Sequence, residues 1–140
     1  MAVKRILRYV ARTRGWGVRY CAMRGKKKLE LVGYSDSNMA GDVDGRKSTS
    51  GMIYFLSSGA ICWQSTKQKV VALSSCEEEY IAASTTATQG VWLARLMEEI
   101  IEKEGDPPML FVDNKATISL IKNSVLHNLS KHIEIRFHYI

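Results

Sequence analysis

The chain has few cysteines and no long apolar run, and each absence excludes a class of protein. Its 140 residues include three cysteines, and none of them form a CxxC pair. An odd cysteine count without that spacing argues against a disulfide framework and a cysteine-based zinc site. No apolar run approaches the ~18 residues that a membrane-spanning helix needs. The first residues alternate charged and apolar side chains, unlike a secretory signal, so we expect an intracellular protein of the cytoplasm or nucleus.

Acidic side chains are missing from one end of the chain. Residues 1–28 carry ten Lys or Arg and no Asp or Glu, whereas the rest carries ten basic and fourteen acidic side chains. A concentrated basic segment favours a polyanionic partner, with nucleic acid first and an anionic membrane surface second. The alternative is a solvated basic surface on an ordinary domain. The basic turn formed by Arg24, Lys26, Lys27 and Lys28 is the predicted nucleic-acid-binding group.

Hydrophobic periodicity predicts an α/β domain without internal repeats. Helices are predicted over 2–12, from about 74 to 103, and over 116–122, and a further periodic segment begins at 133. Strands are predicted over 29–35, 51–56, 60–64 and 109–112, with a weaker candidate at 18–23. The order predicts an antiparallel three-strand meander, followed by a parallel strand that is added through a helical crossover.

Three carboxylates stand where a metal-dependent phosphodiesterase needs them. Asp36 follows the apolar run 29–35, Asp113 follows 109–112, and Glu79 lies in the first turn of the long helix. Cleavage of a phosphodiester with two metal ions requires several hard oxygen ligands around cations about 4 Å apart. Alternatively, Glu77 to Glu79 favour the helix N-terminus through the helix dipole, and Asp36 and Asp113-Asn114 are ordinary residues of strand-end turns.

Several ordered segments carry a family resemblance. They include Gly33-Tyr-Ser-Asp-Ser, Gly59-Ala-Ile-Cys-Trp-Gln-Ser, Glu79-Tyr-Ile-Ala-Ala and Val112-Asp-Asn. Together they resemble the ribonuclease H domain of copia-type (Pseudoviridae) retrotransposon polyproteins. Residues 1–28 look like the connection segment that follows the family's reverse transcriptase, and 29–140 like the ribonuclease H-like domain.

The resemblance implies a mixed ribonuclease H-like sheet and cleavage of the RNA strand of an RNA–DNA hybrid. It also implies that Asp36, Glu79 and Asp113 bind Mg²⁺ or Mn²⁺, with Glu77 as the alternative to Glu79. The family continues into a fifth edge strand and a helix that carries a further metal-binding Asp, which would lie beyond Ile140. We therefore expect a sheet without its fifth strand and weak or absent nuclease activity.

A second interpretation is not enzymatic. Arg5-Ile6-Leu7-Arg8 matches the RxLR pattern of effectors that plant-pathogenic oomycetes secrete and deliver into host cells. Such a protein would act on host defence by binding a host protein. The sequence has neither a signal peptide before this motif nor an acidic Glu-Glu-Arg motif after it. A decayed reading frame without a selected function is a third possibility, and no pattern indicates an oligomeric state.

Overall fold

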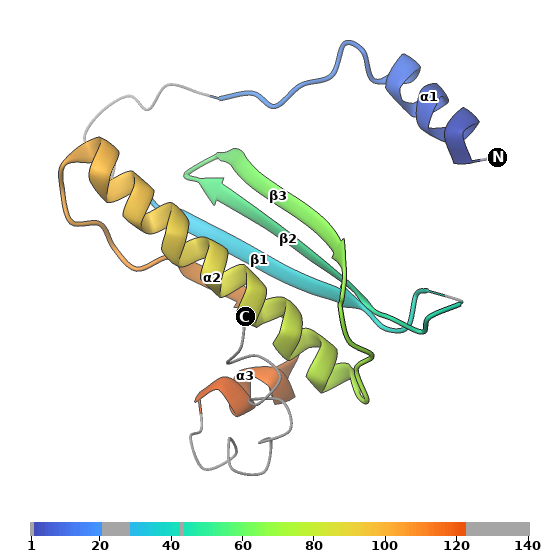
Figure 1. The fold of residues 1–140 in the computed structure, drawn as a ribbon. Helices are drawn as coiled ribbons and strands as arrows, with labels where there is room; N and C mark the ends of the chain where they lie inside the picture. The colour runs from blue at the N-terminus through green and yellow to red at the C-terminus, as the bar shows by residue number, and fades with distance from the viewer. Residues whose placement is uncertain (1, 21–28, 43, 123–140) are drawn as a thin grey trace.

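One mixed sheet and one long helix form the body of the chain (Figure 1). The computed structural model describes residues 2–20, 29–42 and 44–122. In chain order, the elements are α1 (Ala2–Arg12), β1 (Leu31–Asn38), β2 (Thr49–Leu56), β3 (Gly59–Lys67), α2 (Ser75–Ile101), β4 (Met109–Val112) and α3 (Lys115–Lys122). The predicted α/β class is confirmed, and the segment that begins at 133 lies outside the described residues. None of the described helices has the length and apolar character to cross a membrane.

The sheet topology agrees with the sequence prediction. The strand order is β3-β2-β1-β4, in which β1 pairs antiparallel with β2 and parallel with β4, and β2 pairs antiparallel with β3. This is the expected meander with a parallel strand added after a helix. The first strand was expected to end before Asp36, but its ladder with β2 continues to Asn38, opposite Thr49. Of the weak strand candidate 18–23, residues 18–20 form no strand, and the rest lies outside the described residues.

Local hydrogen bonds fix both ends of α2. Ser74 is the N-cap, and its hydroxyl accepts a hydrogen bond from the Glu77 amide at 3.2 Å. The Glu77 carboxylate accepts in turn from the Leu73 amide at 2.7 Å, so two amides at the helix start are satisfied reciprocally. At the other end, Glu102 adopts a left-handed conformation with φ of 54°, which ends the helix ahead of Pro107.

The core lies between α2 and one face of the sheet, and Tyr54 is its centre. Its side chain is fully buried and packs with Leu31 and Leu93. The Tyr54 hydroxyl donates to the Thr86 carbonyl of α2 at 2.8 Å. A Cβ at Gly33 would overlap the Tyr54 ring, and one at Gly90 would overlap its hydroxyl. The two glycines therefore form the slot through which this ring joins sheet to helix.

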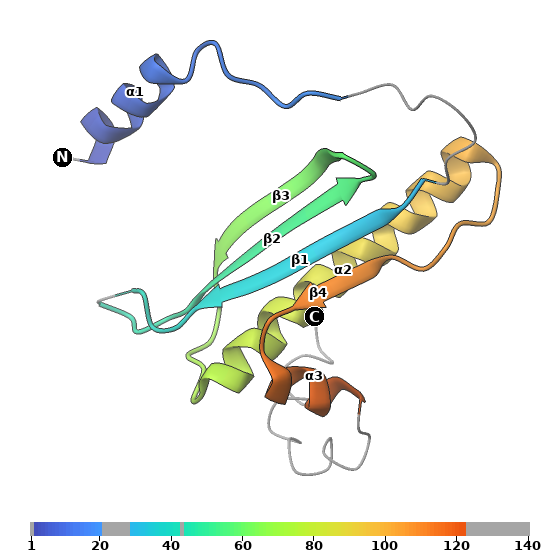
Figure 2. The same ribbon diagram turned by 180° about the vertical axis from the view of Figure 1, so that it is seen from behind.

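The opposite face of the sheet carries aromatic side chains and is covered by none of the described helices (Figure 2). We call Tyr34, Phe55, Trp63 and Phe111 the open face, because strand alternation and register place all four on the side away from α2. The Tyr34 and Phe111 rings stack with centroids 5.2 Å apart, and Phe55 meets Tyr34 edge-on at 5.9 Å. These rings line the sheet without entering the core.

The N-terminal helix stands apart from the sheet (Figures 1 and 2). None of the residues of α1 is buried, and its apolar residues Val3, Ile6, Leu7 and Val10 are each at least 54% exposed. The segment after α1 meets the body through Tyr20, whose hydroxyl donates to the Ala60 carbonyl at 2.6 Å. The helix predicted from periodicity is confirmed, but it has no apolar partner within the described residues.

Candidate metal centre at the ends of β1 and β4

The parallel register brings the two predicted aspartates side by side. In the pairing of β1 with β4, Ser35 lies opposite Val112. The next residue on each segment is therefore Asp36 and Asp113, on neighbouring backbones about 4.8 Å apart. Both side chains are exposed, and the strand β4 ends at Val112. An open edge with two adjacent carboxylates follows.

Glu79 reaches the same edge from α2. Only 6% of this residue is exposed, and its Oε1 accepts a hydrogen bond from the Ser37 amide at 3.2 Å. Burial raises the pKa of Glu79, and the charges of Asp113 and Asp36 raise it further, whereas hydrogen bonding from Ser37 opposes the increase. Its Oε2 is buried and has no hydrogen-bond partner among the described residues. The three acids thus share one electrostatic environment.

These acids approach the edge from two sides of the sheet. The Ser35 hydroxyl faces α2, where it accepts from the Thr86 hydroxyl at 3.2 Å, so alternation directs Asp36 to the open face. Glu79 comes from the helix side. Within the described residues, no group of three or more His, Cys, Asp or Glu side chains is close enough together to hold a metal ion. The sequence did not reveal this separation, because it depends on β1 continuing past Asp36.

The donor chemistry nevertheless fits a divalent cation. Mg²⁺ and Mn²⁺ prefer hard oxygen ligands such as carboxylates. A cation would satisfy the unpaired Glu79 Oε2 and remove the repulsion that raises the pKa of this group. Since β4 ends at Val112, that strand does not separate Asp113 from Glu79, whereas β1 continues to Asn38 between Asp36 and Glu79. Rotation of Asp36 and Asp113 would be needed to assemble the site.

The neighbouring Glu77 has a structural role. It is 1% exposed, and its carboxylate caps the start of α2, as the helix-terminus interpretation expected. Glu78 is 3% exposed, and its backbone carbonyl accepts from the side-chain Nε2 of Gln68 at 3.0 Å. The contacts of Glu77 therefore favour Glu79 over Glu77 as the ligand from α2.

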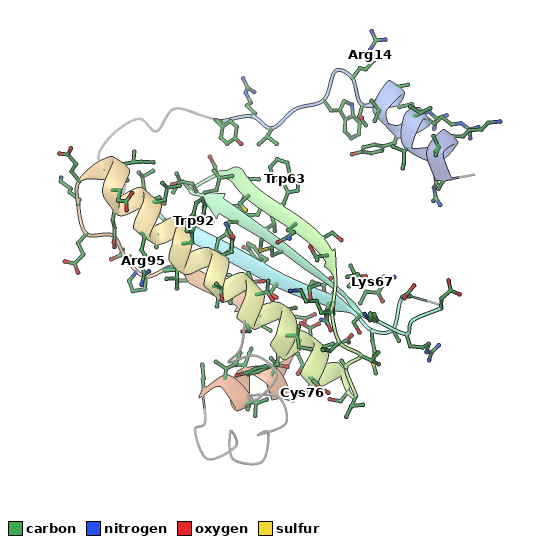
Figure 3. All side chains as sticks on the ribbon, in the orientation of Figure 1. Arg14, Trp63, Lys67, Cys76, Trp92 and Arg95 are labelled. Atoms are coloured by element: carbon green, nitrogen blue, oxygen red, sulfur yellow. The ribbon has the colours of Figure 1, made fainter. Side chains whose placement is uncertain are left out.

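Sequence analysis missed the residues that hold this edge in place. Asn114 caps α3, because its Oδ1 accepts from the Thr117 amide at 3.0 Å. The Thr117 hydroxyl donates to the Cys76 carbonyl at 3.2 Å, which ties α3 to the start of α2 (Figure 3). The Asn-x-x-Thr spacing could have predicted the cap. No local sequence pattern predicts the contact between Thr117 and Cys76 or the hydrogen bond from the Ser37 amide to Glu79.

Two other groups were predicted from the sequence. Arg24, Lys26, Lys27 and Lys28 fall outside the described residues. The motif Arg5-Ile6-Leu7-Arg8 lies within α1, and its Ile6 and Leu7 are 60% and 63% exposed. The described structure does not bring the motif on α1 to the carboxylates (Figure 1).

Comparison with known proteins reveals relatives over nearly the whole chain. It is 44% identical over 139 residues to Retrovirus-related Pol polyprotein from transposon TNT 1-94 of Nicotiana tabacum, covering 99% of this chain and 10% of that protein. It is 39% identical over 139 residues to Retrovirus-related Pol polyprotein from transposon RE1 of Arabidopsis thaliana, covering 99% of this chain and 9% of that protein.

A shorter relative has a different name. The chain is 47% identical over 92 residues to Secreted RxLR effector protein 161 of Plasmopara viticola, covering 66% of this chain and 63% of that protein. No protein-family model matches the chain, and no solved structure does. The chain spans about a tenth of the length of the polyproteins that it matches. The chain is thus similar, over nearly its whole length, to a short part of two retrotransposon Pol polyproteins.

Proposed function

We propose that this chain is a ribonuclease H-like domain that cleaves the RNA strand of an RNA–DNA hybrid with Mg²⁺ or Mn²⁺. The observation that carries the proposal is the parallel register of β1 and β4, which sets Asp36 beside Asp113 while Glu79 closes the edge from α2. The similarity to retrotransposon Pol polyproteins supports it, because copying an RNA genome into DNA passes through such hybrids.

The three carboxylates act together in this proposal. Asp36, Glu79 and Asp113 would hold the cation, which when bound supplies an activated water and neutralises the charge that develops on the phosphate. The Ser37 amide orients Glu79 through its Oε1 and leaves Oε2 available. The exposed aspartates carry no ion pair among the described residues, so they are free to turn toward the metal.

The geometry also sets expectations for rate and pH. The carboxylates must move together from two sides of the sheet before they can bind the cation. This rearrangement weakens cation binding, so we expect slow cleavage. The raised pKa of Glu79 means that protons compete with the cation at a higher pH than they would at an ordinary carboxyl. Activity should therefore fall as the pH drops through that pKa.

The test is cleavage of a labelled RNA strand, annealed to DNA, by the full chain in Mg²⁺ or Mn²⁺. Asp36→Asn should abolish cleavage, because it removes one anionic ligand and preserves the shape of the side chain. Asp44→Asn, in the exposed loop between β1 and β2, is the matched control and should cleave like the parent. A folded parent chain that leaves the hybrid intact would refute the nuclease proposal, as would equal cleavage by the Asp36 variant.

A second candidate function rests on a separate observation. The relative named Secreted RxLR effector protein 161 covers two-thirds of this chain, and Arg5 and Arg8 flank exposed apolar residues on α1. As an effector, the chain would be delivered into a host cell and bind a host protein without hydrolysis. Replacing Arg5 and Arg8 with Ala should then prevent uptake by plant cells, whereas the same change at Arg12 and Arg14 should not. Equal uptake of both variants would argue against this candidate.

A further inference from the structure

The N-terminal helix α1 has two opposite faces of different chemistry. Its four aliphatic residues recur at steps of three and four and are 54–69% exposed, and we call them the apolar stripe: Val3, Ile6, Leu7 and Val10. With about 3.6 residues per turn, the four cations of the helix lie on the opposite side: Lys4, Arg5, Arg8 and Arg12. The helix carries no acidic residue. One short helix is therefore divided lengthwise into an aliphatic face and a cationic face.

The rest of the described chain gives α1 no apolar support. The helix is 11 residues long, and none of them is buried. Figures 1 and 2 show it projecting away from the sheet and from α2. An isolated helix shorter than about 12 residues is marginal in water, because most helical stability in proteins comes from packing of the amphipathic face. A partner that covers the apolar stripe would therefore stabilise α1.

Two common kinds of partner would each use only one face of the helix. A hydrophobic groove on a protein would cover the apolar stripe and leave the opposite cations in water. A nucleic acid would bind the cations through its phosphates and leave the apolar stripe in water. The surface of an anionic lipid bilayer uses both faces, because acyl chains lie beneath a layer of negatively charged headgroups.

The dimensions of the helix keep its cationic face close to the lipid phosphates. An interfacial helix lies in the plane of the bilayer, with its apolar face buried about 5–10 Å into the boundary between headgroups and acyl chains. A helix with its side chains is about 10–12 Å across. The opposite face then lies within the ~8 Å over which charges act at physiological ionic strength. Long Lys and Arg side chains also bend toward polar groups while their stems stay on apolar surface.

Aromatic side chains in and after the helix agree with a lipid surface. Tyr9 is 68% exposed, and Trp16, four residues past the end of α1, is 81% exposed. Tyr and Trp are enriched at membrane–water interfaces, because each combines an apolar ring with a polar group. Arg14 and Arg19 add two cations, and residues 2–20 contain no Asp or Glu.

We propose that α1 is a peripheral anchor that lies in the surface of an anionic lipid bilayer. The apolar stripe enters the acyl boundary, the cationic face lies among the headgroups, and the sheet with α2 stays in the aqueous phase. Such a helix does not cross the bilayer. The proposal is independent of the nuclease proposal, because binding to vesicles needs neither a metal ion nor a hybrid.

Flotation of the full chain with lipid vesicles tests the anchor. The parent should bind vesicles of phosphatidylcholine mixed with phosphatidylserine more tightly than vesicles of phosphatidylcholine alone, and added salt should release it. Ile6→Ser should weaken binding on the order of tenfold, because an aliphatic side chain is lost from the acyl boundary. Arg8→Gln should weaken binding to the mixed vesicles about fivefold, because one cation is lost near the anionic surface.

The matched controls carry the same two changes on α2. Ile100→Ser replaces an isoleucine that is 72% exposed, and Arg95→Gln replaces an exposed arginine (Figure 3). Both should bind the vesicles like the parent. Binding that the controls weaken as much as Ile6→Ser and Arg8→Gln do would show that the body of the chain, not α1, contacts the lipid.

Tryptophan emission locates the part of the chain that enters the lipid. A variant that keeps only Trp16, through Trp63→Phe and Trp92→Phe, should shift its emission to shorter wavelength on the mixed vesicles. A variant that keeps only Trp92, on α2, should not (Figure 3). A parent chain that binds neither kind of vesicle, or both equally, would overturn the proposal. Binding of a single-stranded oligonucleotide through Arg8, without binding of vesicles, would instead assign α1 to nucleic acid.

Discussion

The two faces of the sheet are built from different side chains and have different consequences. The face under α2 alternates small and large residues, with Gly33 and Ser35 beside the fully buried Tyr54. The open face carries Tyr34 and Phe111 at nearly half exposure, followed two residues later by the exposed Asp36 and Asp113. The covered face therefore forms the packed core, whereas the open face carries the exposed aromatic rings and the carboxylates of the candidate site. Stability and function should respond to substitutions on opposite sides of one sheet.

The largest expected effect is on catalysis at the strand ends. Asp113→Asn should reduce cleavage of an RNA–DNA hybrid by on the order of 100-fold or more, because one anionic ligand is lost from the cation that stabilises the transition state. The thermal midpoint should hardly change, since this side chain is exposed. The cleavage rate and the thermal midpoint should be measured on the same variant. A variant that unfolds would show that the strand ends also contribute to stability.

Gly33→Ala should cause the next largest effect, on the covered face. Its Cβ would overlap the Tyr54 ring in a packed core, which costs about 1–3 kcal/mol in the free energy of unfolding. At Gly90 the tightest contact of an added Cβ is with the Tyr54 hydroxyl, and the ring carbon Cζ is next at 3.0 Å. In a Tyr54→Phe background, Gly90→Ala should therefore lose most of its cost, since the tightest contact is gone and Ala favours helix.

Denaturant unfolding of the three single variants, and of Gly33→Ala and Gly90→Ala each combined with Tyr54→Phe, measures these couplings. Gly33→Ala should stay destabilising in the Tyr54→Phe background, because its overlap is with ring carbons that remain. Relief of both substitutions by Tyr54→Phe would contradict the proposed slot.

Glu79→Gln should separate stability from function at the edge where the two faces meet. Burial raises the pKa of Glu79, so its charged form burdens the folded state at neutral pH. Gln keeps the acceptor for the Ser37 amide without the charge, and should increase the free energy of unfolding at pH 7.

The sign of this gain depends on pH. A carboxyl whose folded pKa is raised contributes stability below its unfolded pKa and loses it as the pH rises through the folded value. The advantage of Gln should therefore shrink as the pH falls and Glu79 takes up a proton. Cleavage should be lost in the same variant at every pH. A destabilised Gln variant at pH 7 would show that the charge of Glu79 is compensated.

Trp63→Ser on the open face should have the smallest effect. This ring is 62% exposed, and substitutions at such surface positions usually change stability by less than about 0.5 kcal/mol. Chemical unfolding at low protein concentration, where association is negligible, is the appropriate measurement. A loss as large as that of Gly33→Ala would mean that the open face also contributes to the core.

The sequence predicted the elements better than it predicted the site. Periodicity gave the bounds of α1 and β4 as the structure has them, because each is bounded by polar or glycine-containing segments. It could not give the length of β1, since Asp36 lies within a polar stretch that becomes strand only by pairing with β2. That pairing fixes which way Asp36 points. The slot for Tyr54 was equally hidden, because Gly33 and Gly90 are far apart in sequence and meet through the ring.

Binding of Mn²⁺, followed by broadening of backbone amide signals in nuclear magnetic resonance, tests the central claim most directly. The claim is that Asp36, Glu79 and Asp113 form one cation site at the ends of β1 and β4. We expect the amides of Ser37, Glu79 and Asn114 to broaden together in the parent chain and to stay sharp in Asp36→Asn. Broadening centred on the C-terminal end of α2, near Glu98 and Glu99, would contradict the account. The same broadening in Asp36→Asn as in the parent would also contradict it.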